Sequence, residues 1–324
     1  MLAGCCRASE TIVRVPSLVE VSPPVSAALR SGAPVVALES TIISHGLPRP
    51  GNLDAAREFE AILAGQGVTA ATIALVDGVP RVGLTPGELE RIATDESAVK
   101  VGSRDIAIAM ARKAIGGTTV AATSVLAARA GIRVFATGGL GGVHRGASET
   151  FDESADLTVL SRTPVTVVSA GVKSILDIPA TLERLETLGV AVVGYRTSRF
   201  PAFWLSDSGC DLDWRADSPA EIADIMTARE AFGEQAALLV ANPLPPGEQL
   251  DPRLLDDALA GALAAAAAQG VRGKAVSPFL LEEIQRVTGG VSVGVNLDIA
   301  RGNVDLAARI SRSWSERAEA RASA

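Results

Sequence analysis

The chain has 324 residues, of which 48% are hydrophobic and 3% aromatic, and its formal net charge is −7. That length can hold one large or two modest domains, with a core built mainly from Ala, Val, Leu and Ile. The acidic balance, with no lysine-rich run, argues against nucleic acid as the main partner. Three cysteines and two histidines are too few for a disulfide framework or a His-rich metal site. Any metal is therefore expected to have mainly oxygen ligands, which points to Mg²⁺ or Mn²⁺.

No segment of the sequence predicts a membrane partner. Ala260–Ala268 is the most monotonous apolar run, but it is too short to span a bilayer. Leu2–Cys5 resembles a lipoprotein cleavage box without the basic and apolar regions that should precede it. We therefore expect a cytoplasmic protein.

Residues 1–30 carry two adjacent prolines and little periodicity, so we expect an N-terminal extension that includes at most one docking helix. After it, apolar runs alternate with helical patterns. In chain order, the pattern first predicts a strand at Val35–Leu38, a helix from Asn52 to Gly65 or Gly67, a strand at Ala71–Val76, a helix opened by the capping box at Thr85–Glu88, a helix at Ser103–Ile115, a strand at Val120–Ala122, a helix at Thr123–Gly131 and a strand at Val134–Ala136.

The alternation continues through the second half of the chain. It predicts a strand at Val165–Ser169, a helix at Pro179–Leu188, a strand at Val190–Gly194, a helix at Ser218–Phe232, a strand at Leu238–Ala241, helices at Pro252–Gln269 and Pro278–Thr288, and a terminal helix from about Asn303 to Arg317. Short apolar strands separated by helices are typical of parallel βαβ units. We therefore expect one α/β domain over residues 31–315, a three-layer α/β/α fold with a mostly parallel central sheet, followed by a tail at 316–324.

Lysine is rare in this chain, since only four of its 30 basic residues are lysines. Arginine can supply a positive charge, but it cannot form a Schiff base. Lys173 has the most informative context, because it follows the apolar run Val165–Val168 and a turn of small residues. A desolvated amine at the end of a buried strand can act as a nucleophile. The alternative is a lysine that only caps a helix or meets a carboxylate such as Asp177.

Polar residues follow several of the expected strands. Glu39 comes directly after Val35–Leu38, where a carboxylate is costly unless it is paired or has a function. A salt-bridged or helix-capping Glu39 is the alternative. Because ligands of open α/β sheets bind beyond the carboxyl ends of the strands, we expect such residues to gather there.

The glycine-rich segment 137–146 follows another strand and ends near His144. Its glycines let the backbone approach an anionic ligand, although a mobile lid would carry the same glycines. His144 is a candidate for substrate contact, or an exposed loop histidine without a role. Asp156 lies in an acidic segment, where a hard cation needs only one or two carboxylates and waters. A merely solvated acidic segment is the alternative.

Two further residues are candidates for ligand binding. Lys100 precedes Gly102 and Ser103, a combination of charge and free N–H groups that is typical of an anion site. An ordinary N-cap beside a solvated lysine is the alternative. Asn296 follows the β-branched run from Val291 and could orient a ligand amide or hydroxyl, or simply form a turn. Lys113 and Lys274 lie in ordinary contexts.

Taken together, these segments resemble the pseudouridine-5′-phosphate glycosidase family over roughly residues 30–315. The segments that carry the resemblance are Ala37–Pro48, Lys100–Asp105, Thr137–Gly146, Ser154–Leu157, Val168–Asp177, Gly194–Thr197, Ala241–Pro243 and Val295–Asp298. So many blocks in order are far more specific than any single motif.

The resemblance implies a lyase-like glycosidase of pseudouridine breakdown. Such an enzyme reversibly cleaves the C–C glycosidic bond of pseudouridine 5′-phosphate, giving uracil and ribose 5-phosphate. It also implies a divalent metal, typically Mn²⁺, and a homotrimer. In the implied mechanism Lys173 attacks the anomeric carbon, the ribose ring opens, an iminium links enzyme and sugar, and the uracil carbon is protonated.

The resemblance assigns a role to each matched residue. Glu39 and Lys173 match the catalytic positions, for proton transfer and the Schiff base respectively. Asp156 matches the metal-binding aspartate. The matched substrate-binding positions are Lys100, Thr137, His144 and Asn296.

Two other functions remain possible from the residues alone. A phosphosugar aldolase or isomerase can also use a lysine imine. A non-catalytic phosphosugar-binding protein could keep the fold, but it should have lost at least one of Glu39, Asp156 and Lys173, and all three are present.

Overall fold

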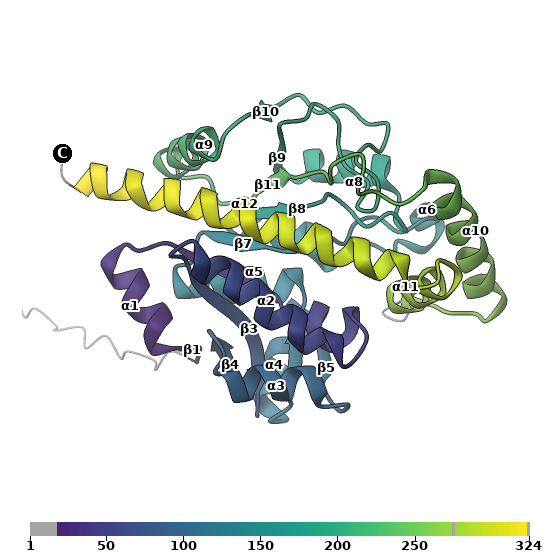
Figure 1. Cartoon of the computed structure of the whole chain (residues 1–324), viewed down its shortest axis with the longest axis horizontal. Coiled ribbons are helices and arrows are strands. Elements are labelled where there is room, and N and C mark those ends of the chain that lie inside the picture. Colours follow the sequence, from purple (N-terminus) through teal and green to yellow (C-terminus); the bar gives the residue numbers. More distant parts are fainter. Residues whose placement is uncertain (1–17, 274–275, 323–324) are drawn as a thin grey trace, which may run out of the picture.

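The computed structural model describes residues 18–273 and 276–322, which form a three-layer α/β/α fold around one sheet (Figure 1). The strands are β1 Glu20–Val21, β2 Val35–Leu38, β3 Thr69–Val76, β4 Val79–Val82, β5 Val99–Val101, β6 Gly116–Thr118, β7 Val134–Ala136, β8 Thr166–Ser169, β9 Ala191–Tyr195, β10 Arg215–Ala216 and β11 Leu238–Ala241. The sheet runs β1-β4-β3-β2-β7-β8-β11-β9-β10, and β6 pairs with β3 and β5.

Nearly every strand pairing is parallel. Among the described residues the antiparallel exceptions are β3 with β4 and β3 with β6. The expected mostly parallel sheet is therefore confirmed. No helix in the described part of the chain is long and apolar enough to cross a membrane.

The helices cover both faces of the sheet. They are α1 Pro23–Ser31, the π-helical turn η1 Ile42–Gly46, α2 Gly51–Gly65, α3 Pro86–Thr94, the 3₁₀ turn η2 Ser103–Asp105, α4 Ile106–Ala111, α5 Val120–Ala130, α6 Ala147–Thr150, α7 Ala155–Leu160, α8 Ile178–Thr187, α9 Pro219–Phe232, α10 Pro252–Ala268, α11 Val276–Val287 and α12 Val291–Ala322. Helix α12 crosses one face between α2 and α9, as Figure 1 shows.

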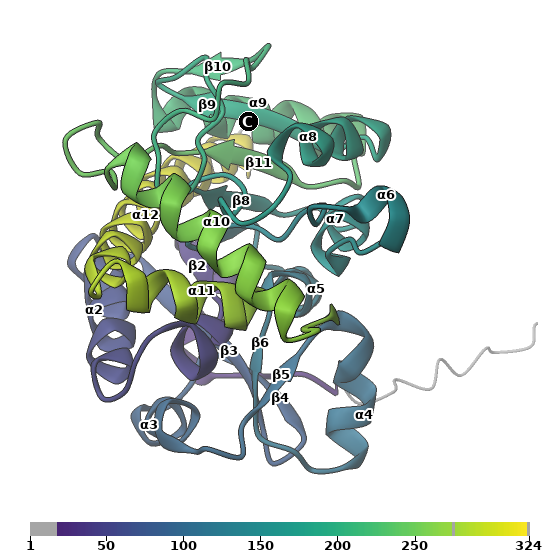
Figure 2. The ribbon, with the colours of Figure 1, turned by 90° about the vertical axis from the view of Figure 1, so that its right-hand side faces the viewer.

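Alternation of side chains along the buried strands divides the core in two. In β2, Val35 and Ala37 pack on the face covered by α5, whereas Val36 and Leu38 pack on the face covered by α2, α9 and α12. Because successive side chains of a strand point to opposite faces, an unbroken apolar run is what a strand buried on both faces requires. Helices α10 and α11 lie against each other near the start of α12 (Figure 2).

The structure corrects the prediction of a helix at Ser103–Ile115 followed by a strand at Val120–Ala122. The strand is β6, which contains Gly116 and Gly117, and Val120 begins α5 after the N-cap residue Thr119. A Cβ atom on Gly117 would lie 2.2 Å from Ser44 Oγ. Glycine is therefore needed at this position for β6 and η1 to pack against each other. The preceding helix is shortened to η2 and α4.

Helix boundaries differ in two further places. Asn52 lies inside α2, where its amide donates to the carbonyl oxygens of Ile43 and Ala93 at 2.8 Å each, and does not cap the helix. The terminal helix begins at Val291, twelve residues before the expected Asn303, and continues through the expected tail to Ala322.

The N-terminal extension includes the docking helix that the sequence allowed. Helix α1 buries Val25, and β1 adds a short strand beside β4. Residues 1–17 and Lys274 lie outside the described residues.

Candidate active site

The carboxyl ends of β2, β7 and β8, which are neighbours in the sheet, lead into the predicted site. Glu39 directly follows β2, Thr137 follows β7, and Lys173 lies in the loop after β8. Parallel pairing is what brings these distant segments to one edge.

Two cavities meet at this edge. The larger, of about 320 Å³ and called the polar cavity below, is lined mainly by polar residues, which include Ser103, Arg104, Thr119, His144, Asp152, Ser154 and Asp156. The smaller, of about 70 Å³, is mainly apolar and is lined by residues that include Ile42, His45, Leu47, Gly138, Gly139, Phe203, Leu281 and Asn296. Both are bounded by Glu39, Thr41, Lys100, Lys173 and Ser277, so the two cavities share one wall.

Glu39 stands between the cavities and is half-buried. Burial raises the pKa of Glu39 above its ordinary value, while Lys173, the Thr137 hydroxyl and Lys100 lower it and Asp156 raises it. Burial is the largest of these effects. A carboxyl group with a raised pKa can keep a proton near neutral pH and donate it to a substrate.

The loop that carries Lys173 is held tightly. The backbone N–H of Lys173 donates to the Leu140 carbonyl at 3.2 Å, and Leu140 also forms a parallel bridge with Val172. Gly171 has a φ of 77°, and a Cβ there would lie 2.3 Å from the Pro201 carbonyl oxygen. A loop so confined fixes the backbone from which the Lys173 side chain reaches the two cavities.

Lys100 lies on β5 and, like Lys173, lines both cavities. Its charge acts on Glu39 and on both histidines. Two lysines and a carboxyl group with a raised pKa are therefore gathered at one boundary.

His144 faces the polar cavity. Burial lowers the pKa of His144; the Asp152 carboxylate opposes this, and Lys100 and Lys173 add to it. The His144 Nδ1 and Asp152 Oδ2 atoms lie 4.0 Å apart. With its pKa below the ordinary 6.5, the imidazole is mainly neutral at pH 7 and can donate or accept a hydrogen bond.

Asp156 is 7% exposed and lies in the first turn of α7. Its Oδ1 accepts from the Ala121 N–H and its Oδ2 from the Gly141 N–H, both at 2.9 Å. A Cβ on Gly141 would lie 2.7 Å from Oδ2, so only glycine permits this approach. Asp156, on α7, therefore connects this helix by hydrogen bonds to α5 and to the glycine-rich loop at the cavity wall.

The donor set is compatible with a hard cation that keeps several waters. Among the described residues, no three His, Cys, Asp or Glu side chains form a ready-made metal cluster. Asp156 and Asp152 both line the polar cavity, whereas the nearby Glu153 is bonded to Arg184 at 2.9 Å. One or two carboxylates plus water is a common way to hold Mg²⁺, and suits Mn²⁺ as well.

Two predicted residues occupy positions that the sequence did not indicate. Thr137 is buried, and its hydroxyl donates to Glu39 Oε1 from behind the cavity wall. Asn296 lies on helix α12 and lines the apolar cavity, with its Oδ1 accepting from the Trp204 indole N–H at 2.5 Å.

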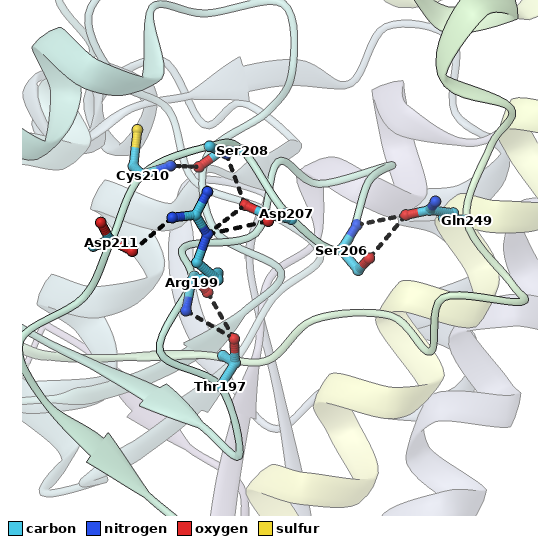
Figure 3. A network of polar contacts seen from close by, with 9 residues as sticks. Thr197, Arg199, Ser206, Asp207, Ser208, Cys210, Asp211 and Gln249 are labelled. Carbon is cyan, nitrogen blue, oxygen red and sulfur yellow. Dashed lines mark hydrogen bonds and ion pairs between the residues drawn. The ribbon is translucent and has the colours of Figure 1, made fainter.

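Several residues of the site were missed, above all Phe203 and Trp204 in the long segment between β9 and β10. Arg199 anchors this segment by binding Asp207 at 3.1 Å and Asp211 at 2.6 Å (Figure 3). The Gln249 side chain accepts hydrogen bonds from both the N–H and the hydroxyl of Ser206. No motif within this segment indicates that it contributes to a site.

A separate cavity of about 270 Å³ lies at the amino-terminal edge of the sheet, around Arg133 and Arg229. Arg229 donates to the Ala236 and Ala237 carbonyls, and Arg133 to Glu230. These arginines already bind protein groups, so the chemistry is assigned to the opposite edge.

Comparison with known proteins agrees with this geometry. Residues 24–313 match the family model of indigoidine synthase A like proteins. Pseudouridine-5′-phosphate glycosidases of Frankia alni and Saccharopolyspora erythraea are each 58% identical over 92% of this chain, covering 83% and 99% of those proteins.

Solved structures share the fold. The prealnumycin C-glycosynthase AlnA, in complex with ribulose 5-phosphate, has a TM-score of 0.86 and 37% identity, over 94% of this chain and 99% of its own. An indigoidine synthase A-like protein of Thermotoga maritima has a TM-score of 0.81 and 36% identity, over 88% and 94% of the two chains. The chain is therefore an enzyme of the pseudouridine-5′-phosphate glycosidase family.

Proposed function

We propose that this enzyme cleaves the C–C glycosidic bond of pseudouridine 5′-phosphate, reversibly, to give uracil and ribose 5-phosphate. The observation that carries the proposal is the shared wall of the two cavities, where Glu39 and Lys173 lie between a polar and an apolar compartment. A sugar phosphate fits the polar compartment and a flat base the apolar one, which brings the bond between them to the shared wall.

Lys173 is proposed as the covalent nucleophile. Its amine attacks the anomeric carbon, and the bond from that carbon to the ring oxygen breaks, so that the sugar opens. A proton then adds to the uracil carbon, the C–C bond breaks, and the amine lone pair forms an iminium with the sugar. Water hydrolyses the iminium, releasing ribose 5-phosphate and the free lysine. A carbon leaving group needs this route because it is a much poorer leaving group than the nitrogen of an ordinary nucleoside.

Glu39 is proposed as the proton donor to the uracil carbon. Its raised pKa favours the protonated form, and Glu39 lines both cavities together with Lys173, where the bond would break. Lys100 is proposed to hold sugar or phosphate oxygens, and the neutral His144 to bind a sugar hydroxyl.

A divalent metal, Mn²⁺ by preference, is proposed to be held by Asp156 with Asp152 as a second carboxylate. When bound it would neutralise charge on the sugar phosphate. The active species is proposed to be a homotrimer. The pentulose phosphate bound by AlnA supports a pentose phosphate as ligand of the polar cavity.

The test is uracil release from pseudouridine 5′-phosphate with Mn²⁺, followed by borohydride reduction with ribose 5-phosphate and peptide mapping. The proposal expects uracil and a ribose-phosphate adduct on the Lys173 peptide. Uracil without an adduct would remove the Schiff base. Activity on simple ketose or aldose phosphates, with none on pseudouridine 5′-phosphate, would instead indicate an aldolase or isomerase.

A further inference from the structure

The Trp204 indole N–H donates a hydrogen bond of 2.5 Å to Oδ1 of Asn296. Asn296 lines the apolar cavity, whereas Trp204 is 1% exposed and lies behind it. The hydrogen bond therefore joins a buried side chain to one on the cavity wall.

This contact fixes which way the Asn296 amide faces. An amide can often be turned over without a visible change of shape, but an indole N–H is only a donor. The oxygen of Asn296 must therefore face Trp204. No described residue accepts a hydrogen bond from its Nδ2 group, so two N–H donors remain for a ligand on a residue that lines the apolar cavity.

Trp204 is itself held without freedom to turn. Its carbonyl accepts from the Leu250 N–H at 3.1 Å, and the preceding Phe203 N–H donates to Ala170 at 3.0 Å. The rings of Phe203 and Trp204 lie 5.2 Å apart at 57°. Phe203 has a φ of 61°, a backbone conformation that is unfavourable for a non-glycine residue, so the surrounding contacts must hold it in place.

We propose that Trp204 determines base specificity by holding Asn296 as a hydrogen-bond donor toward the apolar cavity. A base that presents a carbonyl oxygen there is bound, and a base that presents an amino group in the same place is rejected because two donors then face each other. Trp204 is a positioning residue, since it acts through Asn296. The inference rests on the proposed function only in taking a pyrimidine base as the ligand of this cavity.

The test measures dissociation constants of uracil, cytosine and isocytosine by calorimetry without ribose 5-phosphate, so that the reverse reaction cannot occur. Cytosine and isocytosine each replace a different uracil carbonyl by an amino group. The wild-type protein is expected to reject one of them by about tenfold to a hundredfold relative to uracil, the cost of an unpaired buried donor. In Trp204→Phe, that ratio should fall to within about threefold because the amide can turn over.

Two further variants make the result decisive. Asn296→Asp keeps an acceptor for Trp204 and places a second oxygen in the cavity, so it should prefer the amino-substituted base. Trp214→Phe removes the same N–H from an exposed residue of the same segment (71% exposed) and should keep the wild-type ratio.

Some results would overturn the inference. One is a Trp204→Phe protein with the wild-type ratio, or with all three affinities lowered by the same factor. Another is a wild-type protein that binds none of the three bases. Because binding is read without turnover, selective binding of uracil by a protein that does not cleave pseudouridine 5′-phosphate would overturn the proposed function and keep the role of Trp204.

Discussion

The hydroxyl of Thr137, at the end of β7, donates a hydrogen bond to Oε1 of Glu39, at the end of β2. The Thr137 carbonyl in turn accepts from the Asn303 amide of α12 at 2.7 Å. A helix on one face of the sheet therefore holds the residue that orients the proposed proton donor. This chain of contacts explains why a buried threonine belongs to the site without lining either cavity.

Replacing Glu39 with Gln should lower kcat/KM by about 10²–10⁴-fold, the usual contribution of a positioned acid. Since burial raises the pKa of Glu39, the fraction of wild-type enzyme carrying the proton falls as pH rises through that pKa. Wild-type kcat should therefore decline on the alkaline side, and the residual rate of the variant should lack this limb. A pH–rate profile of both proteins checks this. A variant that retains the alkaline limb would assign it to another group.

The same substitution should stabilise the fold at higher pH. The folded-state pKa of Glu39 lies above its ordinary value of 4.5, so its contribution to stability is complete below pH 4.5 and is lost as pH rises through the folded pKa. Above that pKa the folded wild type must bury a charge, whereas Gln carries none. The melting temperature of Glu39→Gln should thus exceed that of the wild type at alkaline pH and approach it on acidification. The exposed Glu183→Gln is the control, and an equal rise in that protein would remove the explanation.

Replacing Lys173 with Arg should leave the fold intact and reduce turnover by at least roughly 10⁴-fold, because guanidinium cannot form the iminium. Lys113→Arg makes the same change at an exposed position and should keep activity. Uracil release and borohydride trapping should both disappear in the first variant alone. Substantial turnover by Lys173→Arg would exclude the covalent role.

The sheet and the main site residues could be predicted because they depend on local pattern. Val35–Leu38 reads as a strand buried on both faces, and parallel order then puts Glu39, Thr137 and Lys173 at one edge. The strand β6 was missed because Gly116 and Gly117 are poor strand formers in isolation. They are required here only because β5, β3 and η1 crowd around them, which is a tertiary constraint.

The residues at the apolar cavity could not be predicted either, because their positions also depend on tertiary packing. Asn296 was placed after a β-branched run, yet packing makes that run the first turn of α12. Phe203 reaches the cavity, and Trp204 lies behind it, on a long irregular segment. The path of this segment depends on the ion pairs of Arg199 and on contacts with Ala170. Neither residue stands at a strand end, where sequence reasoning looks for ligands.

Substitutions of Asp152 and Asp156, the two aspartates proposed to hold the metal, should have different effects on metal dependence and stability. Asp152→Asn should raise the Mn²⁺ concentration needed for half-maximal activity by about 10–100-fold while preserving the melting temperature of the metal-free protein. Asp156→Asn should also destabilise that protein by about 1–3 kcal/mol, because the new amide cannot accept from both Ala121 and Gly141. Metal titrations and thermal unfolding give both quantities. An Asp156→Asn protein with unchanged stability would contradict the structural part of this account.

The adjacent glycines 138 and 139 should respond differently to alanine. In Gly139→Ala the new Cβ would lie 2.6 Å from Phe203 Cδ2, so the ring must shift and the fold should lose about 1–3 kcal/mol. In Gly138→Ala the Cβ would make ordinary contacts of 3.6 Å with Phe203 and 3.9 Å with Ile42, so stability should change by less than about 0.5 kcal/mol.

Gly138→Ala nevertheless places a methyl group against the walls of the apolar cavity, whose volume is only about 70 Å³. Its uracil affinity should fall while ribose 5-phosphate binding, in the polar cavity, is retained. Unfolding measurements together with titrations of each product check both variants. If Gly138→Ala weakened ribose 5-phosphate and left uracil unchanged, the assignment of base and sugar to the two cavities would have to be exchanged.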